Sequence, residues 1–240
     1  MTSPETPAVV GDSRQLQIER LVAGGDAMAR DADGRVVFVE GALPGETVDV
    51  ELIVVKRDFA RGRVTGIVAP SPQRVVPPCA HVADGCGGCD WQHLAATAQH
   101  DAKVEVVREA FARTGRLPDV AIVRGAAVAH DALRTTVRMA VTGDGKLGFR
   151  RAASHDVVGI ERCLVMHPLL AQLVSSIGVR GTGEVTLRCG DATGERGVWS
   201  HDRARLLGLP AEVAAGAKAI VHEEVAGVRL QVAKGNYDDL

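Results

Sequence analysis

The segment CAHVADGCGGCDWQH, residues 79–93, places Cys79, Cys86 and Cys89 in one short run rich in glycine. Thiolates gathered in this way are the ligands of zinc and iron–sulfur centres. A role as small core residues is disfavoured, because the surrounding glycines and polar residues offer no apolar interior to pack into. The segment therefore predicts a metal-binding loop.

Two kinds of centre fit these residues. Cys86 and Cys89 form the two-residue knuckle of zinc sites, and His93 or Cys79 would complete a shell of three cysteines and one histidine. An iron–sulfur site instead takes several cysteines from one loop and another from far along the chain, and Cys163 supplies that distant thiol. The long gap before Cys86 argues against a radical enzyme, whose loop is usually CxxxCxxC. Chemistry alone favours iron–sulfur over zinc only modestly.

The remaining cysteine and the loop histidines have simpler interpretations. Cys189 lies in TLRCGDATGE, a predicted hairpin, and is interpreted as an unreactive strand cysteine. His81 and His93 are interpreted as loop histidines that hydrogen-bond nearby backbone, and ligation by His93 would favour zinc. The odd number of cysteines, 5, does not suggest a disulfide framework.

The segment before the loop must provide a scaffold, and its pattern predicts a small OB-like β-barrel over residues 14–72. Apolar residues alternate in short runs, with turns expected at Asp33-Gly34 and Pro44-Gly45. Such strands at regular spacing are typical of small barrels. The expected strands lie at residues 16–22, 35–39, 48–54 and 64–68. Residues 1–13 are predicted to form a disordered leader.

Residues 73–233 are expected to form an α+β central domain that carries the metal loop. A helix is predicted over residues 94–114, and Gly115 stands where a helix C-cap would. A second helix is expected at Pro168–Ile177, with proline in its first turn. The strands of this central domain are expected at residues 133–141, 146–150, 184–189 and 218–232. The first helix should turn one face inward, formed by Val104, Val107, Ala110 and Phe111. The fold class is therefore β-rich α+β.

Charge and composition bound the partners. The net charge is −2, so any nucleic-acid surface must be a local patch, and basic residues concentrate in residues 56–74 and 103–151. OB-type barrels bind single strands along a basic groove with stacking aromatics, for which Phe59 and Phe149 are the nearby candidates. RNA contacts are predicted for Lys56, Arg57, Arg61, Arg63, Arg134, Arg138, Phe149 and Arg150. The N-terminus lacks signal-peptide features and no apolar run is long enough to cross a bilayer, so a cytoplasmic location is expected.

Several blocks of sequence resemble the N-terminal part of the bacterial RNA (uracil-5-)-methyltransferases that carry an iron–sulfur cluster and modify ribosomal RNA. The resemblance implies that the barrel is a TRAM domain and that the loop holds a [4Fe–4S] cluster. The implied ligands are Cys79, Cys86, Cys89 and Cys163. The blocks are VFVEGALPGETVDVEL (37–52), SPQRVVPPCAHVADGCGGCDWQHL (71–94), AQHDAK (98–103) and GKLGFRRAASHDVVGIERCLV (145–165).

In that family, a C-terminal methyltransferase domain binds S-adenosyl-L-methionine and supplies the nucleophilic cysteine. Neither its glycine-rich loop nor its cysteine is found here, and residues 234–240 do not match. The chain is therefore expected to be truncated before a Rossmann-like domain, with no catalytic or cofactor-binding residues of its own, and whether it is an enzyme stays open. The alternatives are a stand-alone RNA-binding module, working with a separate methyltransferase chain, and a zinc-stabilised interaction protein.

Overall fold

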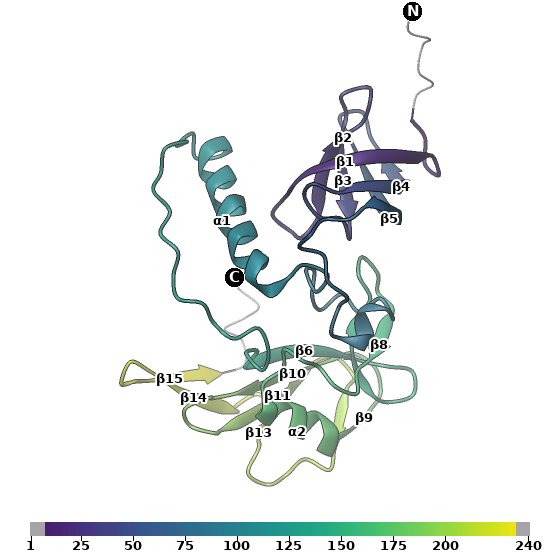
Figure 1. Cartoon of the computed structure of the whole chain (residues 1–240). Helices are drawn as coiled ribbons and strands as arrows, with labels where there is room; N and C mark the ends of the chain where they lie inside the picture. Colours follow the sequence, from purple (N-terminus) through teal and green to yellow (C-terminus); the bar gives the residue numbers. More distant parts are fainter. Residues whose placement is uncertain (1–7, 234–240) are drawn as a thin grey trace, which may run out of the picture. The chain divides into compact units, whose positions relative to one another are not determined.

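The computed structural model describes residues 8–233, and the chain separates into two compact units (Figure 1). Unit 1 contains the residues up to Pro78 together with Asp90–Ala127, and unit 2 contains Cys79–Cys89 together with the residues from Val128 onward. The predicted tail and the first seven residues of the predicted leader lie outside the described residues. The domain boundary expected between residues 72 and 73 stays a prediction. Neither α-helix within residues 8–233 is long and apolar enough to span a membrane.

Unit 1 is built on a closed five-stranded barrel, as the alternating pattern predicted. The strands close in the order β1-β2-β3-β5-β4, in which β3 and β5 run parallel and the other neighbours run antiparallel. The strands are β1 (Ser13–Leu21), β2 (Ala27–Arg30), β3 (Val36–Glu40), β4 (Thr47–Val55) and β5 (Phe59–Ala69). This arrangement confirms the OB-like fold, and the predicted Asp33-Gly34 turn joins β2 to β3.

The barrel interior is filled by every second residue of its strands. Val37 and Val39 of β3 and Val48 and Val50 of β4 are all fully buried, because alternate side chains of a strand point to the same face. Gly62 of β5 belongs to this interior, where a Cβ would lie 2.2 Å from the Cγ1 of Val50. A small aliphatic core of this kind needs few aromatic residues, which agrees with their scarcity in the sequence.

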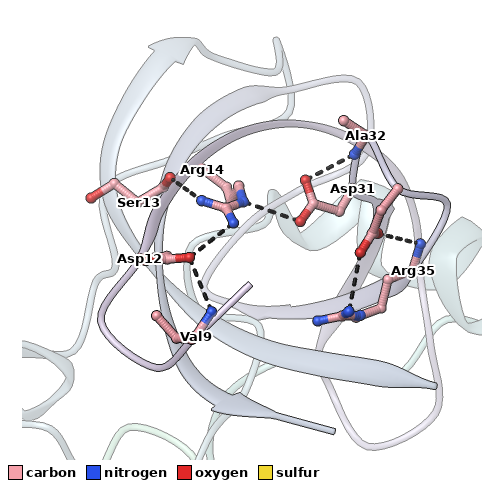
Figure 2. Close-up of polar contacts among 8 residues, drawn as sticks. Val9, Asp12, Ser13, Arg14, Asp31, Ala32 and Arg35 are labelled. Atoms are coloured by element: carbon pink, nitrogen blue, oxygen red, sulfur yellow. Dashed lines mark hydrogen bonds and ion pairs between the residues drawn. The ribbon is translucent and has the colours of Figure 1, made fainter. Parts of the chain in front are cut away.

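Arg14 ties the start of β1 to the turn between β2 and β3 (Figure 2). Its guanidinium lies 2.9 Å from the carboxylate of Asp12 and 3.1 Å from that of Asp31. Asp12 also accepts a hydrogen bond from the Val9 N–H, and this bond is the main reason that the pKa of Asp12 is lowered. The polar network fixes the end of the barrel at which the described chain enters.

Helix α1 (Ala96–Arg113) follows the barrel in unit 1. The small residues Ala98 and Ala102 pack against the barrel core, and Arg20 of β1 pairs with Glu109 at 2.5 Å. The predicted inward face is wrong in part, because only Val104 is buried within the helix. Val107 and Phe111 are 43% and 41% exposed.

The C-terminal end of α1 also departs by one residue from the prediction. The C-cap is Thr114, and Gly115 follows it. A larger residue at position 115 would clash, because a Cβ on Gly115 would lie 2.8 Å from the Phe111 carbonyl oxygen. The left-handed residue that reverses the chain is Arg116, whose φ is 55°.

Unit 2 is organised by a six-stranded sheet in the order β13-β11-β10-β6-β7-β8 (Figure 1). Its strands are β6 (Thr136–Val141), β7 (Leu147–Arg150), β8 (Val157–Gly159), β10 (Glu184–Cys189), β11 (Arg196–Ser200) and β13 (Ala214–Ala215). Helix α2 (Pro168–Ser176) buries Leu170 and Leu173 in the core of this sheet, and the His167 side chain caps its first turn. The predicted hairpin and second helix are confirmed.

Two further strand pairs complete unit 2. They are β9 (Gly178–Arg180) with β12 (Arg205–Leu207), and β14 (Ile220–Val225) with β15 (Val228–Ala233). The predicted strand region at residues 218–232 is thus a hairpin, which turns at Ala226 and Gly227 with φ values of 51° and 78°. Val221 of this hairpin packs with Trp199 of β11 in a small core of its own.

Candidate metal centre and nucleic-acid interface

The cysteine loop is an ordered part of unit 2. A single 3-10 turn, η1 (Ala80–Val82), follows Cys79, and the Cys86 N–H then donates to the His81 carbonyl at 2.9 Å. Cys86 and Gly87 then run beside the turn that follows β7. Cys86 forms an isolated bridge with Arg151 there. The Gly87 N–H donates to the Arg150 carbonyl at 3.0 Å. Backbone pairing therefore fixes the loop.

Close approach and backbone conformation favour the glycines of this loop. A Cβ on Gly87 would lie 2.9 Å from the Ala152 nitrogen, and one on Gly85 would lie 2.3 Å from an Nη atom of Arg151. Gly88 lies against the sulfur of Cys86, which a Cβ would approach to 3.4 Å. The backbone at Gly87 is thus packed too closely for a larger residue, while Gly85 is favoured by its left-handed φ of 83°.

The thiol of Cys86 lies within electrostatic range of the other predicted ligands. Burial raises the pKa of Cys86, a hydrogen bond from Gly88 works in the opposite direction, and the net pKa is raised. The charges that add to this rise belong to Cys89, Cys79 and Cys163. Cys163 therefore lies within electrostatic range of Cys86, and a shared centre for the four thiols stays a prediction.

Cys163 lies in the segment between β8 and α2, and it packs against the core of unit 2 together with Cys86. Among residues 8–233, however, no three His, Cys, Asp or Glu side chains lie close enough together to hold one metal ion. The donor set fits an iron–sulfur cluster in its chemistry, with four half-buried thiols and a glycine-rich loop. The identity of the centre stays a prediction.

The two loop histidines have other partners. His81 lies 3.2 Å from the Asp84 carboxylate. The pKa of His93 is lowered, first by burial and then by the charge of Arg74, while a hydrogen bond to the Ala42 backbone opposes this. His93 is therefore neutral at pH 7 and bonded to backbone within unit 1, which agrees with its interpretation as a loop histidine.

The basic residues predicted on the barrel lie on its exposed surface. Lys56 and Arg57 are in the turn between β4 and β5, and the Arg57 side chain is 95% exposed. Arg61 lies 2.7 Å from the Asp26 carboxylate, and its guanidinium is 5.6 Å from the centre of the Phe38 ring. Carboxylates therefore offset part of the positive charge here, and Glu51 does the same for Arg63 at 3.2 Å.

The residues predicted on the sheet divide into three kinds. Arg138 and Arg150 are exposed, and both pair with Glu184, at 2.5 and 2.8 Å. Arg134 is partly buried and donates to the Gly88 carbonyl. Phe149 is 9% exposed and belongs to the core, because it shares the inner face of β7 with Leu147, two residues before it. Its ring is thus withdrawn from the candidate RNA contacts.

Sequence reasoning missed Glu184, the acid that holds two of the predicted arginines. Burial works to raise its pKa, but the hydrogen bonds from Arg150 and Arg138 outweigh burial, and the pKa is lowered. The signal was weak, because Glu184 lies far along the chain from both arginines, and the pairings of β10 with β6 and of β6 with β7 bring them together.

Cys189 lies apart from this chemistry. It is fully buried at the end of β10, and burial, with the charges of Asp191 and Glu223 acting in the same direction, raises the pKa of its thiol to about 11. A thiol in this state is a poor nucleophile at neutral pH. The environment agrees with its interpretation as an unreactive strand cysteine.

Residues 7–65 match the TRAM domain family. The 23S rRNA (uracil(1939)-C(5))-methyltransferase RlmD of Halomonas elongata is 42% identical over 166 residues, which cover 67% of this chain and 34% of that protein. The corresponding protein of Chromohalobacter salexigens is 38% identical over 164 residues, again covering 34% of its length. The chain thus spans about a third of these relatives.

A solved structure of similar fold is the tRNA (uracil-54, C5)-methyltransferase of Pyrococcus abyssi in complex with S-adenosyl-L-homocysteine. Its TM-score is 0.59 at 19% sequence identity, and the match covers 92% of this chain and 60% of that one. At this identity the likeness supports the fold alone. Taken together, the chain contains a TRAM domain and is homologous, over two thirds of its length, to part of the rRNA uracil-C5 methyltransferases.

Proposed function

We propose that this chain is the RNA-binding, [4Fe–4S]-carrying part of an S-adenosyl-L-methionine-dependent RNA (uracil-5-)-methyltransferase that acts on ribosomal RNA. The observation that supports the proposal is that Cys79–Cys89 and Cys163 belong to the same unit, with Cys163 in electrostatic range of Cys86, in a chain homologous to such enzymes. TRAM-type barrels of OB topology suit single-stranded RNA, which supports RNA as the partner.

The proposed cluster ligands are the four half-buried thiols, Cys79, Cys86, Cys89 and Cys163. With all irons ligated by the protein, such a centre supplies a cross-link between distant segments and contributes to folding. The chain's own residues shape the loop: Gly87 allows close approach of the backbone at Ala152, Gly85 adopts a left-handed φ, and the Gly88 N–H donates to the sulfur of Cys86. The role is structural, with no redox step assigned.

The proposed RNA contacts are the exposed basic residues of each unit, taken separately for the two units. On the barrel these are Lys56, Arg57, Arg61 and Arg63, and on the sheet they are Arg138 and Arg150. Because several of them are already paired with carboxylates, RNA phosphates must compete with Asp26, Glu51 and Glu184. Affinity is therefore expected to be moderate and to fall with salt.

Methyl transfer is not assigned to these residues. Outside the four proposed ligands the remaining cysteine is Cys189, whose burial and raised pKa make it unsuited to attack a uracil ring. Catalysis would depend on a methyltransferase domain, in the same polypeptide or in a separate chain. Calorimetry with S-adenosyl-L-methionine is expected to give no binding to the chain itself, and measurable binding would reveal a site that this proposal lacks.

Anaerobic purification tests the metal centre. The chain is expected to be brown, to absorb near ~400 nm and to carry about four irons and four sulfides. The Cys163→Ser variant is expected to lose most of that iron, whereas Cys189→Ser is expected to keep it, since its thiol is buried elsewhere in the sheet. A colourless chain with stoichiometric zinc would overturn the cluster in favour of a zinc-stabilised protein.

A further inference from the structure

Arg134 joins the two segments that carry the cysteines of unit 2. Its backbone pairs with the segment just after Cys163: its N–H donates to the Val165 carbonyl at 2.7 Å, and its carbonyl accepts from the His167 N–H at 3.0 Å. This is a parallel bridge, in which Arg134 stands opposite Met166. The main chain of Arg134 is therefore fixed relative to the segment of Cys163.

The side chain of Arg134 reaches the cysteine loop. Its Nη2 donates to the Gly88 carbonyl at 2.7 Å. Gly88 lies between Cys86 and Cys89, and a Cβ on it would lie 3.4 Å from the sulfur of Cys86 and 3.7 Å from the ring of Phe149. One residue thus contacts the loop through its guanidinium and the segment of Cys163 through its backbone.

We propose that Arg134 is a positioning residue, which sets the distance between the CGGC segment and Cys163. This inference rests on the proposed function of the four cysteines. A guanidinium suits the task, because it is always charged, presents several planar donors and is less strongly hydrated than an ammonium group.

This role separates Arg134 from the arginines of the proposed RNA surface. Arg138 lies on β6 with its side chain 55% exposed, whereas the Arg134 side chain is partly buried and its donor is engaged by the loop. RNA phosphates could reach only the other N–H groups of this partly buried guanidinium, since Nη2 donates to Gly88 at 2.7 Å. Substitution of Arg134 is therefore expected to change RNA affinity much less than it changes the position of Cys163 relative to the loop cysteines.

A first experiment needs no metal. The full chain is prepared without metal under reducing conditions and oxidised with diamide, and the disulfides between Cys163 and the loop cysteines are quantified by mass spectrometry. Arg134→Met is expected to slow these disulfides at least five-fold, while the local disulfide between Cys86 and Cys89 forms at the usual rate. Arg162→Met is the matched control, because it removes an exposed positive charge directly beside Cys163.

A second measurement follows the loaded protein. Arg134→Met is expected to hold less than half of the wild-type iron and to change the visible circular dichroism of the centre, and Arg134→Lys is expected to restore part of both. If Arg134→Met does not fold, the disulfide assay is read on Arg134→Lys, for which at least a two-fold slowing is expected. Wild-type disulfide rates in the variant that folds would overturn the inference. A wild-type chain that binds no iron but still shows Arg134-dependent disulfides would refute the cluster and leave the positioning role intact.

Discussion

Arg74 donates two hydrogen bonds to the carboxylate of Glu46, at 2.6 and 2.7 Å, and that carboxylate is fully buried. The same carboxylate accepts the backbone N–H groups of Leu43 and Ser71. Burial works to raise the pKa of Glu46, but these hydrogen bonds outweigh burial and the pKa is lowered. The pair fastens the loop before β4 to the segment that leaves the barrel toward the cysteine loop.

Removal of Arg74 is expected to be costly, because it leaves a buried carboxylate without its counter-charge. Arg74→Met should lower the free energy of unfolding by about 3 kcal/mol, as measured by urea denaturation of the metal-free chain. Arg63→Met breaks an exposed pair with Glu51 on the same barrel, and its effect should stay below about 1 kcal/mol. Equal effects of the two substitutions would show that burial of Glu46 does not decide the energetics.

His93 is expected to make the free energy of unfolding depend on pH in the range below about 6.5. Burial, and then the charge of Arg74, lower the pKa of His93, so the folded chain keeps this ring neutral where the unfolded chain protonates it. Below the unfolded pKa of about 6.5 the unfolded state therefore binds the extra proton, and stability is lost as the pH falls. The slope from this group approaches about 1.4 kcal/mol per pH unit. The lowered pKa of Glu46 acts in a separate window, below about 4.5, where protonation of the carboxylate removes its contribution.

Urea denaturation of the metal-free chain at several pH values between 5 and 7 measures this slope. His93→Phe is expected to flatten the profile in that range, although it will lower stability at pH 7 because the bond to Ala42 is lost. His155→Gln, at an exposed histidine, serves as the control and should leave the profile unchanged. An unchanged slope in His93→Phe would assign the acid sensitivity to other groups.

The barrel was predictable because its information is local. Val48, Val50 and Leu52 alternate with polar residues on β4, and all three are buried in the structure. Helix α1 was predictable as a helix but not in its buried face, because Ala98 and Ala102 make the contact with the barrel while the larger Phe111 stays exposed. Size was the misleading signal there: small residues allow the close approach of a helix to a barrel.

The interactions of the candidate site were harder to predict, because they depend on distant partners. Cys86 and Cys89 are recognisable by spacing, but the bond from Arg134 to Gly88 follows only from tertiary packing. Phe149 had a local signal that favoured burial, since it lies two residues after Leu147 and so on the same face of a short strand. Three-residue strands such as β8 offer too little pattern to be read from sequence.

Cys189 is expected to resist alkylation in the folded chain. Its thiol is fully buried and burial raises its pKa to about 11, so less than about one part in a hundred is thiolate at pH 8. Iodoacetamide labelling of the metal-free chain at pH 8, followed by mass spectrometry, should modify the four half-buried cysteines at least ten-fold faster than Cys189. Labelling in 6 M guanidinium should remove the difference. Rapid modification of Cys189 in the folded chain would contradict its burial in the sheet.

The ammonium of Lys56 is expected to contribute to RNA affinity through phosphate contact. It lies exposed in the turn between β4 and β5, where its backbone N–H donates to the Phe59 carbonyl. Lys56→Met should weaken binding of a single-stranded, uridine-containing RNA about three-fold to ten-fold and lower the slope of log K against log salt by about 0.7. Lys146→Met removes the same charge from an exposed position outside the proposed surface and should change neither quantity. Fluorescence anisotropy between 50 and 300 mM salt measures both. If the two lysine variants lose affinity equally, the RNA responds to net charge alone, and the barrel face carries no particular contact.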